Sequence, residues 1–300
     1  LDLGQELRFS YEEDGVNAVF GAMYSRLDKK VRYNYYNMGM KHYARDTTDT
    51  YAAFGQVKIP FWEKWAITGG LRLEHYTTDF KEEDTGYSDS GSWTSLSPKL
   101  ALEYSITDDN LVYTSVSRGS RAAGFDAYQG SPGNYEFDEE ELWAFELGSK
   151  NTFWDGKARV NAALFYYKFN SMQLESYTNT MMGPMPSIKN VGNPTAFGGE
   201  LEVAVMPLPG LELFGSTGYT HMRYDTFEDD LGDHTGNHVP YVPELTYNVG
   251  LQYRSPKGFF VRAEVLGATE SYLDSTNTGY IPEHALVNAK IGWEFDKVEA

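Results

Sequence analysis

The sequence predicts an all-β fold: an antiparallel transmembrane β-barrel with short periplasmic turns and long extracellular loops. Three observations predict it. Seven short polar turns recur at spacings of 40 to 53 residues, and segments that alternate apolar with polar residues flank these turns. The chain also holds 23 Tyr, 17 Phe and 6 Trp, an aromatic content typical of the girdles at membrane interfaces.

The composition argues against several other classes of protein. The mean hydropathy is −0.50, and no apolar run approaches the roughly 20 residues of a membrane-spanning helix, whereas a spanning β-strand needs only about 9–11. A net charge of −18 argues against nucleic-acid binding, because phosphate requires clustered Lys and Arg. With no cysteine, the chain has neither disulfides nor Cys-ligated metals.

The short turns carry residues that favour tight reversals, such as Asp-Gly at 155–156 and Pro-Leu-Pro-Gly at 207–210. Their centres lie near Asp14, Trp62, Asp108, Asp155, Leu208, Lys257 and Lys297. About thirteen strands lie between them, and a fourteenth is expected to begin at Val298. With the turns on the periplasmic side, the extracellular loops are expected at 27–47, 77–93, 119–139, 179–188, 223–238 and 270–281.

Alternation with a period of two predicts the individual strands. It is clear at 3–12, 65–74, 245–253, 259–265 and 291–295. In a barrel the apolar face meets lipid and the polar face lines a wet lumen, whereas in a soluble sandwich the apolar face is buried against a second sheet. Alternation alone does not separate these two folds, but aromatic residues that gather near the short turns favour the barrel. The aromatics expected at a membrane interface are Tyr11, Trp62, Trp65, Tyr104, Trp154, Tyr253, Phe259, Trp293 and Phe295.

Several motifs follow one another in an order that is typical of one protein family. They are Tyr113-Thr-Ser-Val-Ser-Arg-Gly-Ser-Arg-Ala-Ala-Gly-Phe125, Trp143-Ala-Phe-Glu-Leu-Gly-Ser-Lys150, Met172-Gln-Leu, Asn190-Val-Gly, Gly199-Glu-Leu-Glu and Val239-Pro-Tyr-Val-Pro. Together they resemble the TonB-dependent outer-membrane receptors, which are gated importers of ferric siderophores and similar scarce nutrients. Met-Gln-Leu and Val-Pro-Tyr-Val-Pro are most similar to the pesticin and yersiniabactin receptor branch.

The resemblance implies an N-terminal plug inside a barrel of 22 strands. Residues 1–300 would then form a single barrel domain of about thirteen strands, and we expect the plug and the last strands to be missing from it. The implied function is import of a ferric siderophore across the Gram-negative outer membrane, energised through TonB. A passive porin, or a receptor for haem, cobalamin or another metal complex, is the alternative.

The resemblance also implies the partners. They are outer-membrane lipid and lipopolysaccharide, the plug, TonB and a small-molecule iron complex, with no nucleic acid. No cofactor is expected beyond the transported ligand. An enzyme is not expected, because no Ser/His/Asp set can be placed on one rim.

Two groups of cations are candidate ligand-binding residues. Arg118 and Arg121 flank the lip of one strand, where they could meet an anionic ligand or a plug carboxylate; ion pairing with Glu103 or Glu146 is the alternative. Tyr128 is a candidate for an aromatic ligand wall. The loop at 27–47 carries Lys29, Lys30, Arg32, Lys41 and Arg45, which could attract an anionic iron complex. For this loop the alternatives are a solvated surface or a contact with lipopolysaccharide.

One further group has metal-ligand types. His234 and His238 lie near Asp229, Asp230 and Asp233. A chance cluster in a loop is favoured over a metal site, because nothing in the sequence fixes the scaffold that a metal requires.

Overall fold

Tight turns reverse the chain where the sequence places its polar turn residues. Asp14 and Gly15 have φ angles of 51° and 77°, and Gly258 has 88°, a left-handed backbone that aspartate and glycine adopt at low cost. Each turn leads into a strand that pairs back on its predecessor, as at Glu13↔Val16. The computed structural model describes residues 2–35, 40–84, 86–126, 136–180, 183–229 and 231–295.

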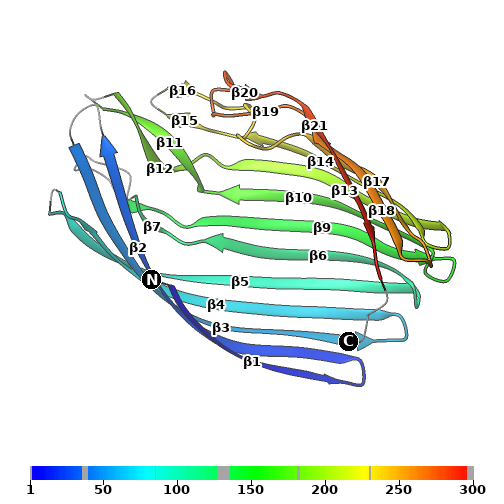
Figure 1. Cartoon of the computed structure of the whole chain (residues 1–300). Helices are drawn as coiled ribbons and strands as arrows, with labels where there is room; N and C mark the ends of the chain where they lie inside the picture. The colour runs from blue at the N-terminus through cyan, green and yellow to red at the C-terminus, as the bar shows by residue number, and fades with distance from the viewer. Residues whose placement is uncertain are drawn as a thin grey trace, which may run out of the picture.

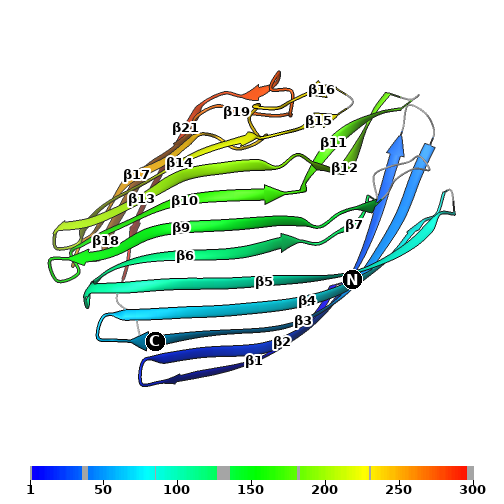
Figure 2. The same cartoon turned by 180° about the vertical axis from the view of Figure 1, so that it is seen from behind.

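Thirteen strands form one antiparallel sheet in the order β1-β2-β3-β4-β5-β6-β9-β10-β13-β14-β17-β18-β21, curved as Figure 1 and Figure 2 show. Their bounds are β1 Asp2–Glu13, β2 Val16–Tyr35, β3 Met40–Phe61, β4 Trp65–Glu82, β5 Ser88–Thr107, β6 Asn110–Arg121, β9 Glu140–Phe153, β10 Ala158–Asn170, β13 Pro194–Leu208, β14 Leu211–Tyr224, β17 Leu245–Arg254, β18 Phe259–Ala268 and β21 His284–Trp293. The predicted antiparallel sheet and its thirteen strands are confirmed. In the described part of the chain, β1 and β21 are its edges, and no helix there could cross a membrane.

Four small two-stranded sheets lie in the long connections, at the end of the sheet opposite the tight turns (Figure 1). They pair β7 Gly124–Phe125 with β8 Glu136–Phe137, β11 Met172–Thr180 with β12 Gly183–Val191, β15 Glu228–Asp229 with β16 Gly232–Asp233, and β19 Ser271–Tyr272 with β20 Tyr280–Ile281. The expected sorting of connections into short turns and long loops therefore holds for these four.

Two of the connections that we expected to be long loops are extensions of strands instead. β2 and β3 stay paired as far as Tyr35↔Met40, and β4 and β5 as far as Lys81↔Ser88. Polar residues occupy both faces of these extensions, so the apolar alternation that reveals a strand in sequence is absent. The expected turn near Lys297 and the strand after it lie outside the described residues.

The two faces of the sheet differ in chemistry, as predicted. In β4, Leu71 and Leu73 are about half exposed on one face, whereas Tyr76 and Phe80 on the other are 2% exposed. We call these the outer and the inner face. Antiparallel partners share a face, so the register extends both faces across all thirteen strands.

Several charged residues on the inner face form ion pairs with one another. Their ion pairs include Arg72–Glu74, Lys58–Glu103 and Arg262–Glu264, with N–O distances of 2.6, 2.6 and 2.5 Å. Pairing of this kind lowers the cost of charges in a confined lumen.

On the inner face, aromatic rings pack over glycines that stand directly across from them on the neighbouring strand. The cross-strand pairs are Gly21↔Phe54, Gly148↔Tyr113, Gly198↔Phe165 and Gly250↔Phe214. In each pair the ring fills the place of a glycine side chain, so that an added Cβ would lie only 2.4–2.6 Å from it. A larger residue at these glycines would displace a ring that is itself packed, as Phe54 is between two arginines.

Gly198 provides a test of this packing. We expect Gly198→Val to lower the free energy of unfolding by about 1–3 kcal/mol, because its Cβ would meet both the Phe165 ring and the Tyr219 carbonyl. Gly69→Val is the matched control, since an added Cβ there meets nothing within 4 Å. Urea unfolding in detergent measures both variants, and equal midpoints would contradict the packing role.

Candidate functional site

The connection between β6 and β9 folds onto the inner face. Phe125 stacks on Phe80 with ring centroids 5.5 Å apart and meets Trp93 edge-on at 6.0 Å. The backbone N–H of Ala123 donates to the Tyr76 hydroxyl at 2.9 Å. The Gly-Phe that ends the first motif therefore anchors this connection against the strands. The contact lies at the end of the sheet opposite the tight turns, which we call the mouth.

Gln173, in the Met-Gln-Leu motif, joins this connection to the hairpin β11–β12. Its side chain is 3% exposed, and its Nε2 donates to the carbonyls of Ala122 and Asp138 at 2.9 Å and of Arg121 at 3.3 Å. Asn190 does the same from the other strand of the hairpin, donating to the carbonyls of Ser171 and Asp138. Each amide bonds to backbone on both sides of the contact, so the two side chains together fix the relative positions of two long connections.

The connection between β14 and β17 contributes Phe227 and Val239 to a buried cluster that also contains Val191 of β12 and Ala196 of β13. Phe227 packs on Tyr224 and on His234, at 4.8 and 5.0 Å between ring centroids. His234 and Asp229 are buried and lie 2.8 Å apart through Nε2 and Oδ1. Burial raises the pKa of the Tyr224 phenol, and the negative charge of Asp229 adds to this.

His238 lies apart from His234, so the structure does not assemble the metal-ligand types that the sequence places together. Its ring is 5.2 Å from that of Tyr272, and its Nδ1 is 3.9 Å from Glu244. Burial lowers the pKa of His238, and the neighbouring Arg223 lowers it further. Among the residues with described positions, no three His, Asp or Glu side chains are placed to hold a metal ion.

Arg118 and Arg121 lie on opposite faces of β6. Arg118 shares the face of Val116, which is the outer one, and stands across from Trp143. It binds Glu141 and the Leu96 carbonyl, and it lies 3.7 Å from Glu139. The expected ion pairing therefore occurs, but not with Glu103 or Glu146, because both of those carboxylates are on the inner face.

The charge of Arg118 acts on its partner. Its guanidinium holds the pKa of Glu141 below the usual range. Arg121 is exposed on the inner face, across from Glu140, and donates to the Gln173 carbonyl at 3.4 Å. Of the two arginines, Arg121 is thus the one that faces the mouth.

The basic residues of 27–45 are also divided between the faces. Lys29 stands across from Asp46 on the inner face, one step from the buried Ala44. Lys30, Arg32 and Arg45 are on the outer face, with Arg45 bound to Asp28 at 2.9 and 2.7 Å. The side chain of Lys41 lies outside the described residues, as does the whole of Tyr128.

The nine candidate interface aromatics lie at the tight-turn end. Trp65 opposes Tyr104 with ring centroids 4.7 Å apart, and Phe259 opposes Trp293 at 6.1 Å. Tyr11 and Tyr253 share their outer face, Phe295 follows β21, and Trp62 and Trp154 stand in turns with 81% and 71% exposure. Their place at a membrane interface stays a prediction.

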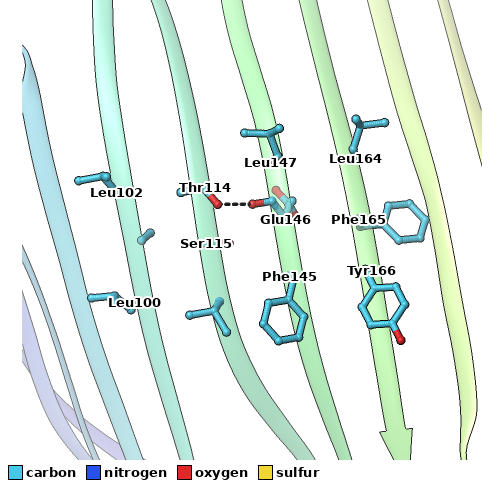
Figure 3. Close-up of a pocket in the computed structure, with 12 residues that line it drawn as sticks. Leu100, Leu102, Thr114, Ser115, Phe145, Glu146, Leu147, Leu164, Phe165 and Tyr166 are labelled. Carbon is cyan, nitrogen blue, oxygen red and sulfur yellow. Dashed lines mark hydrogen bonds between the residues drawn. The ribbon is translucent and has the colours of Figure 1, made fainter.

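An apolar groove lies on the outer face of the sheet, among the middle strands. It has a volume of about 520 Å³, and Leu100, Leu102, Leu147 and Leu164 line it from three strands (Figure 3). Tyr166 and Thr114 are among its polar residues, and the Thr114 hydroxyl donates to the Glu146 carbonyl at 3.1 Å, as drawn in Figure 3. A leucine-lined wall in which the Thr114 hydroxyl is bonded to the backbone suits contact with lipid acyl chains.

The family assignment rests on a match across almost the whole chain. The family model described as "TonB dependent receptor-like, beta-barrel" matches residues 1–299. The chain belongs to this family. It is therefore an outer-membrane barrel chain, and its relatives are receptors rather than enzymes.

Individual relatives of this receptor chain come from several bacteria. The pesticin receptor of Yersinia enterocolitica is 27% identical over 97% of the chain and 44% of the receptor. The probable TonB-dependent siderophore receptor PiuA of Acinetobacter baumannii is 21% identical over 78% of the chain and 33% of PiuA. The chain thus spans less than half the length of these relatives.

A solved structure confirms the fold of the receptor chain. The ferric yersiniabactin uptake receptor FyuA of Yersinia pestis has a TM-score of 0.79 at 24% identity, over 97% of this chain and 46% of FyuA. This likeness shows the barrel fold alone.

The residues that anchor the connections at the mouth were not predicted from the sequence. Phe125, Gln173 and Asn190 stood within the motifs but were assigned no role. The one available signal was a polar glutamine between two apolar residues, a position that needs an internal partner if it is buried.

The clamp formed by Gln173 can be tested by removing its donor. We expect Gln173→Leu to remove three hydrogen bonds made by one buried side chain, and to open the connection after β6 to protease by a factor of about 10 to 100, equivalent to about 1–3 kcal/mol. Gln5→Leu, on the exposed outer face of β1, is the control. Cleavage of the two variants at the same rate would rule out the clamp.

Proposed function

We propose that this chain is the membrane wall of a TonB-dependent importer whose complete form takes up a ferric siderophore. The observation that carries the proposal is the alignment of 97% of the chain with pesticin receptors, in a family whose model spans residues 1–299. The inner face supports it, because it is polar, carries several ion pairs, and meets the anchored connection between β6 and β9. Such a wall suits a lumen that holds another part of the protein and a polar ligand.

The remaining parts of the importer follow from the length of the relatives. We propose a plug domain, further strands that close the barrel, and a segment that contacts TonB, all belonging to the same receptor as residues 1–300. Outer-membrane lipid and lipopolysaccharide would surround the outer face.

Arg121 is the cation that we place on the ligand path. It is exposed on the inner face beside a clamped connection, and ferric siderophore complexes are often anionic. Lys29 lies on the same face, across from Asp46. Arg118 instead joins the ends of β6 and β9 through its ion pair with Glu141. Lys30, Arg32 and Arg45 face away from the lumen.

Energy dependence separates an importer from a passive porin. We expect cells that express the complete receptor to take up a labelled ferric siderophore, and a protonophore to abolish that uptake within minutes. Siderophore uptake that persists in the presence of the protonophore would identify a porin. Parallel uptake of haem, cobalamin and a copper complex tests the other substrate classes.

Neutralisation of Arg121 tests the ligand path. We expect Arg121→Gln to weaken binding of the anionic iron complex by about 5- to 30-fold, since one nearby charge contributes about 1–2 kcal/mol at a partly desolvated site. Arg118→Gln should weaken the contact between the ends of β6 and β9, with a smaller effect on ligand binding. Lys257→Gln, at a tight turn on the opposite side, is the control; a binding loss that is equal for Arg121→Gln and this control would sink the assignment.

A further inference from the structure

A hollow lies on the inner face of the first five strands of the sheet, away from the mouth. It has a volume of about 470 Å³. Two of its lining residues, Thr68 and Ala101, are small and only 5% and 8% exposed. Gly70 stands between Gln56 and Lys99 in the register, and an added Cβ there would lie 3.5 and 3.6 Å from their side chains. The floor is therefore formed by small residues, and longer side chains stand around it.

The two lysines of the hollow differ in their partners. Lys58 binds Glu103, with Nζ and Oε2 2.6 Å apart. Lys99 is exposed, and among the residues whose positions are described it forms no hydrogen bond and has no carboxylate within 4 Å. The charge of Lys99 is therefore available to a ligand in the lumen.

Two other carboxylates face the lumen on either side of Lys99. Glu12 also lines the hollow, but it lies on β1, four strands and about 19 Å from β5. Glu146 lies on β9, two strands from β5, and accepts a hydrogen bond from the Tyr113 hydroxyl. Neither carboxylate is placed to pair with Lys99.

Cations follow one another along the inner face of β2 to β5. From the mouth toward the tight turns they are Lys29, Arg72, Lys99 and Lys58. Except for Lys99, each has a carboxylate beside it, in turn Asp46, Glu74 and Glu103. A charged solute crosses a pore when each site holds it strongly enough to enter and weakly enough to leave. A series of partly neutralised cations meets this requirement for an anion, and Lys99 is its strongest step.

The position of Lys99 along its strand places it below the mouth. It lies five residues from Tyr104, which is about 17 Å along the strand and about 13 Å in height at a tilt of about 40°. That is close to the middle of a barrel's apolar band, which is roughly 25 Å tall. Lys99 stands across from Ser117, four residues before Arg121 on β6 and about 10 Å lower. A ligand from outside reaches it only after it has passed Arg121.

We propose that Lys99 and Gln56 form a second anion subsite, which receives a carboxylate or similar oxyanion group of the imported chelate after it leaves the mouth. The Lys99 ammonium supplies the charge, the Gln56 amide supplies donors, and the small floor between them leaves room for the group. The inference deepens the proposed import of a ferric siderophore and rests on it. A carboxylate of the plug has the same chemistry, so the test must separate the two sources.

The test introduces one thiol beside the subsite. Residues 1–300 contain no cysteine, so Gln56→Cys places a single reactive group in this wall of the complete receptor. The purified receptor, otherwise free of cysteine, is treated in detergent with an anionic and with a cationic methanethiosulfonate, and the two reaction rates are compared. The measurement is repeated after Lys99→Gln and after Lys290→Gln. Lys290 is the matched control, because it faces the lumen from β21, where it lies 5.8 Å from the ring centre of Phe260.

We expect the ratio of the anionic to the cationic rate to fall about 4- to 7-fold after Lys99→Gln. One unit charge about 7–10 Å away changes each rate about 2- to 3-fold, in opposite directions for the two reagents. Lys290→Gln should leave the ratio unchanged, and Lys99→Arg should preserve it. Millimolar citrate, a tricarboxylate, should slow the labelling before Lys99→Gln and not after it.

A ratio that Lys99→Gln does not change would overturn the proposal. Two other results would also overturn it, because they would assign Lys99 to a carboxylate of the plug. One is a thiol that reacts with neither reagent. The other is an unfolding temperature of the complete receptor that falls after Lys99→Gln and not after Lys290→Gln. Absence of energy-dependent uptake by the parent would contradict the importer, whereas the labelling rates would still decide the subsite.

Discussion

The antiparallel register is the constraint on which the rest of this structure depends. In a membrane every backbone N–H and C=O must be bonded within the protein, so strands cannot slip or fray without a large cost. A fixed register fixes the face of every side chain, because consecutive residues point to opposite sides. Lys29 and Lys30 are sequence neighbours with different environments for this reason alone. Arg118 and Arg121, three residues apart, are divided in the same way.

The inner face combines this register with tight packing. Rings occupy the space above the glycines opposite them, and arginines cover rings, as Arg262 covers Phe214 at 4.5 Å. The same aromatic surface then receives Phe125 from a connection above it. The wall and the covers of its mouth are thus parts of one packed unit, and movement of the connection between β6 and β9 requires that the Gln173 amide release its carbonyls.

The sequence was sufficient for the turns, the thirteen strands and the polarity of the two faces, because all three depend on local patterns. It was not sufficient for the upper ends of β2 to β5, where both faces are polar and alternation carries no signal. It also did not identify Glu141 as the partner of Arg118. The partner depends on which face of the sheet each side chain occupies, and the register places Glu103 and Glu146 on the inner face, whereas Arg118 is on the outer face. The anchors Phe125 and Gln173 contact residues tens of positions away, and no local pattern encodes such contacts.

The positions of individual charges matter more for anion binding than the net charge of the chain. A chain of −18 would repel an anionic iron complex at long range, but charges screened over about 8 Å at physiological salt act mainly on their neighbours. Capture of an anion therefore depends on the cations at the point of contact. The register places Arg121 on the inner face and separates it from Lys30 and Arg45, which lie on the outer face.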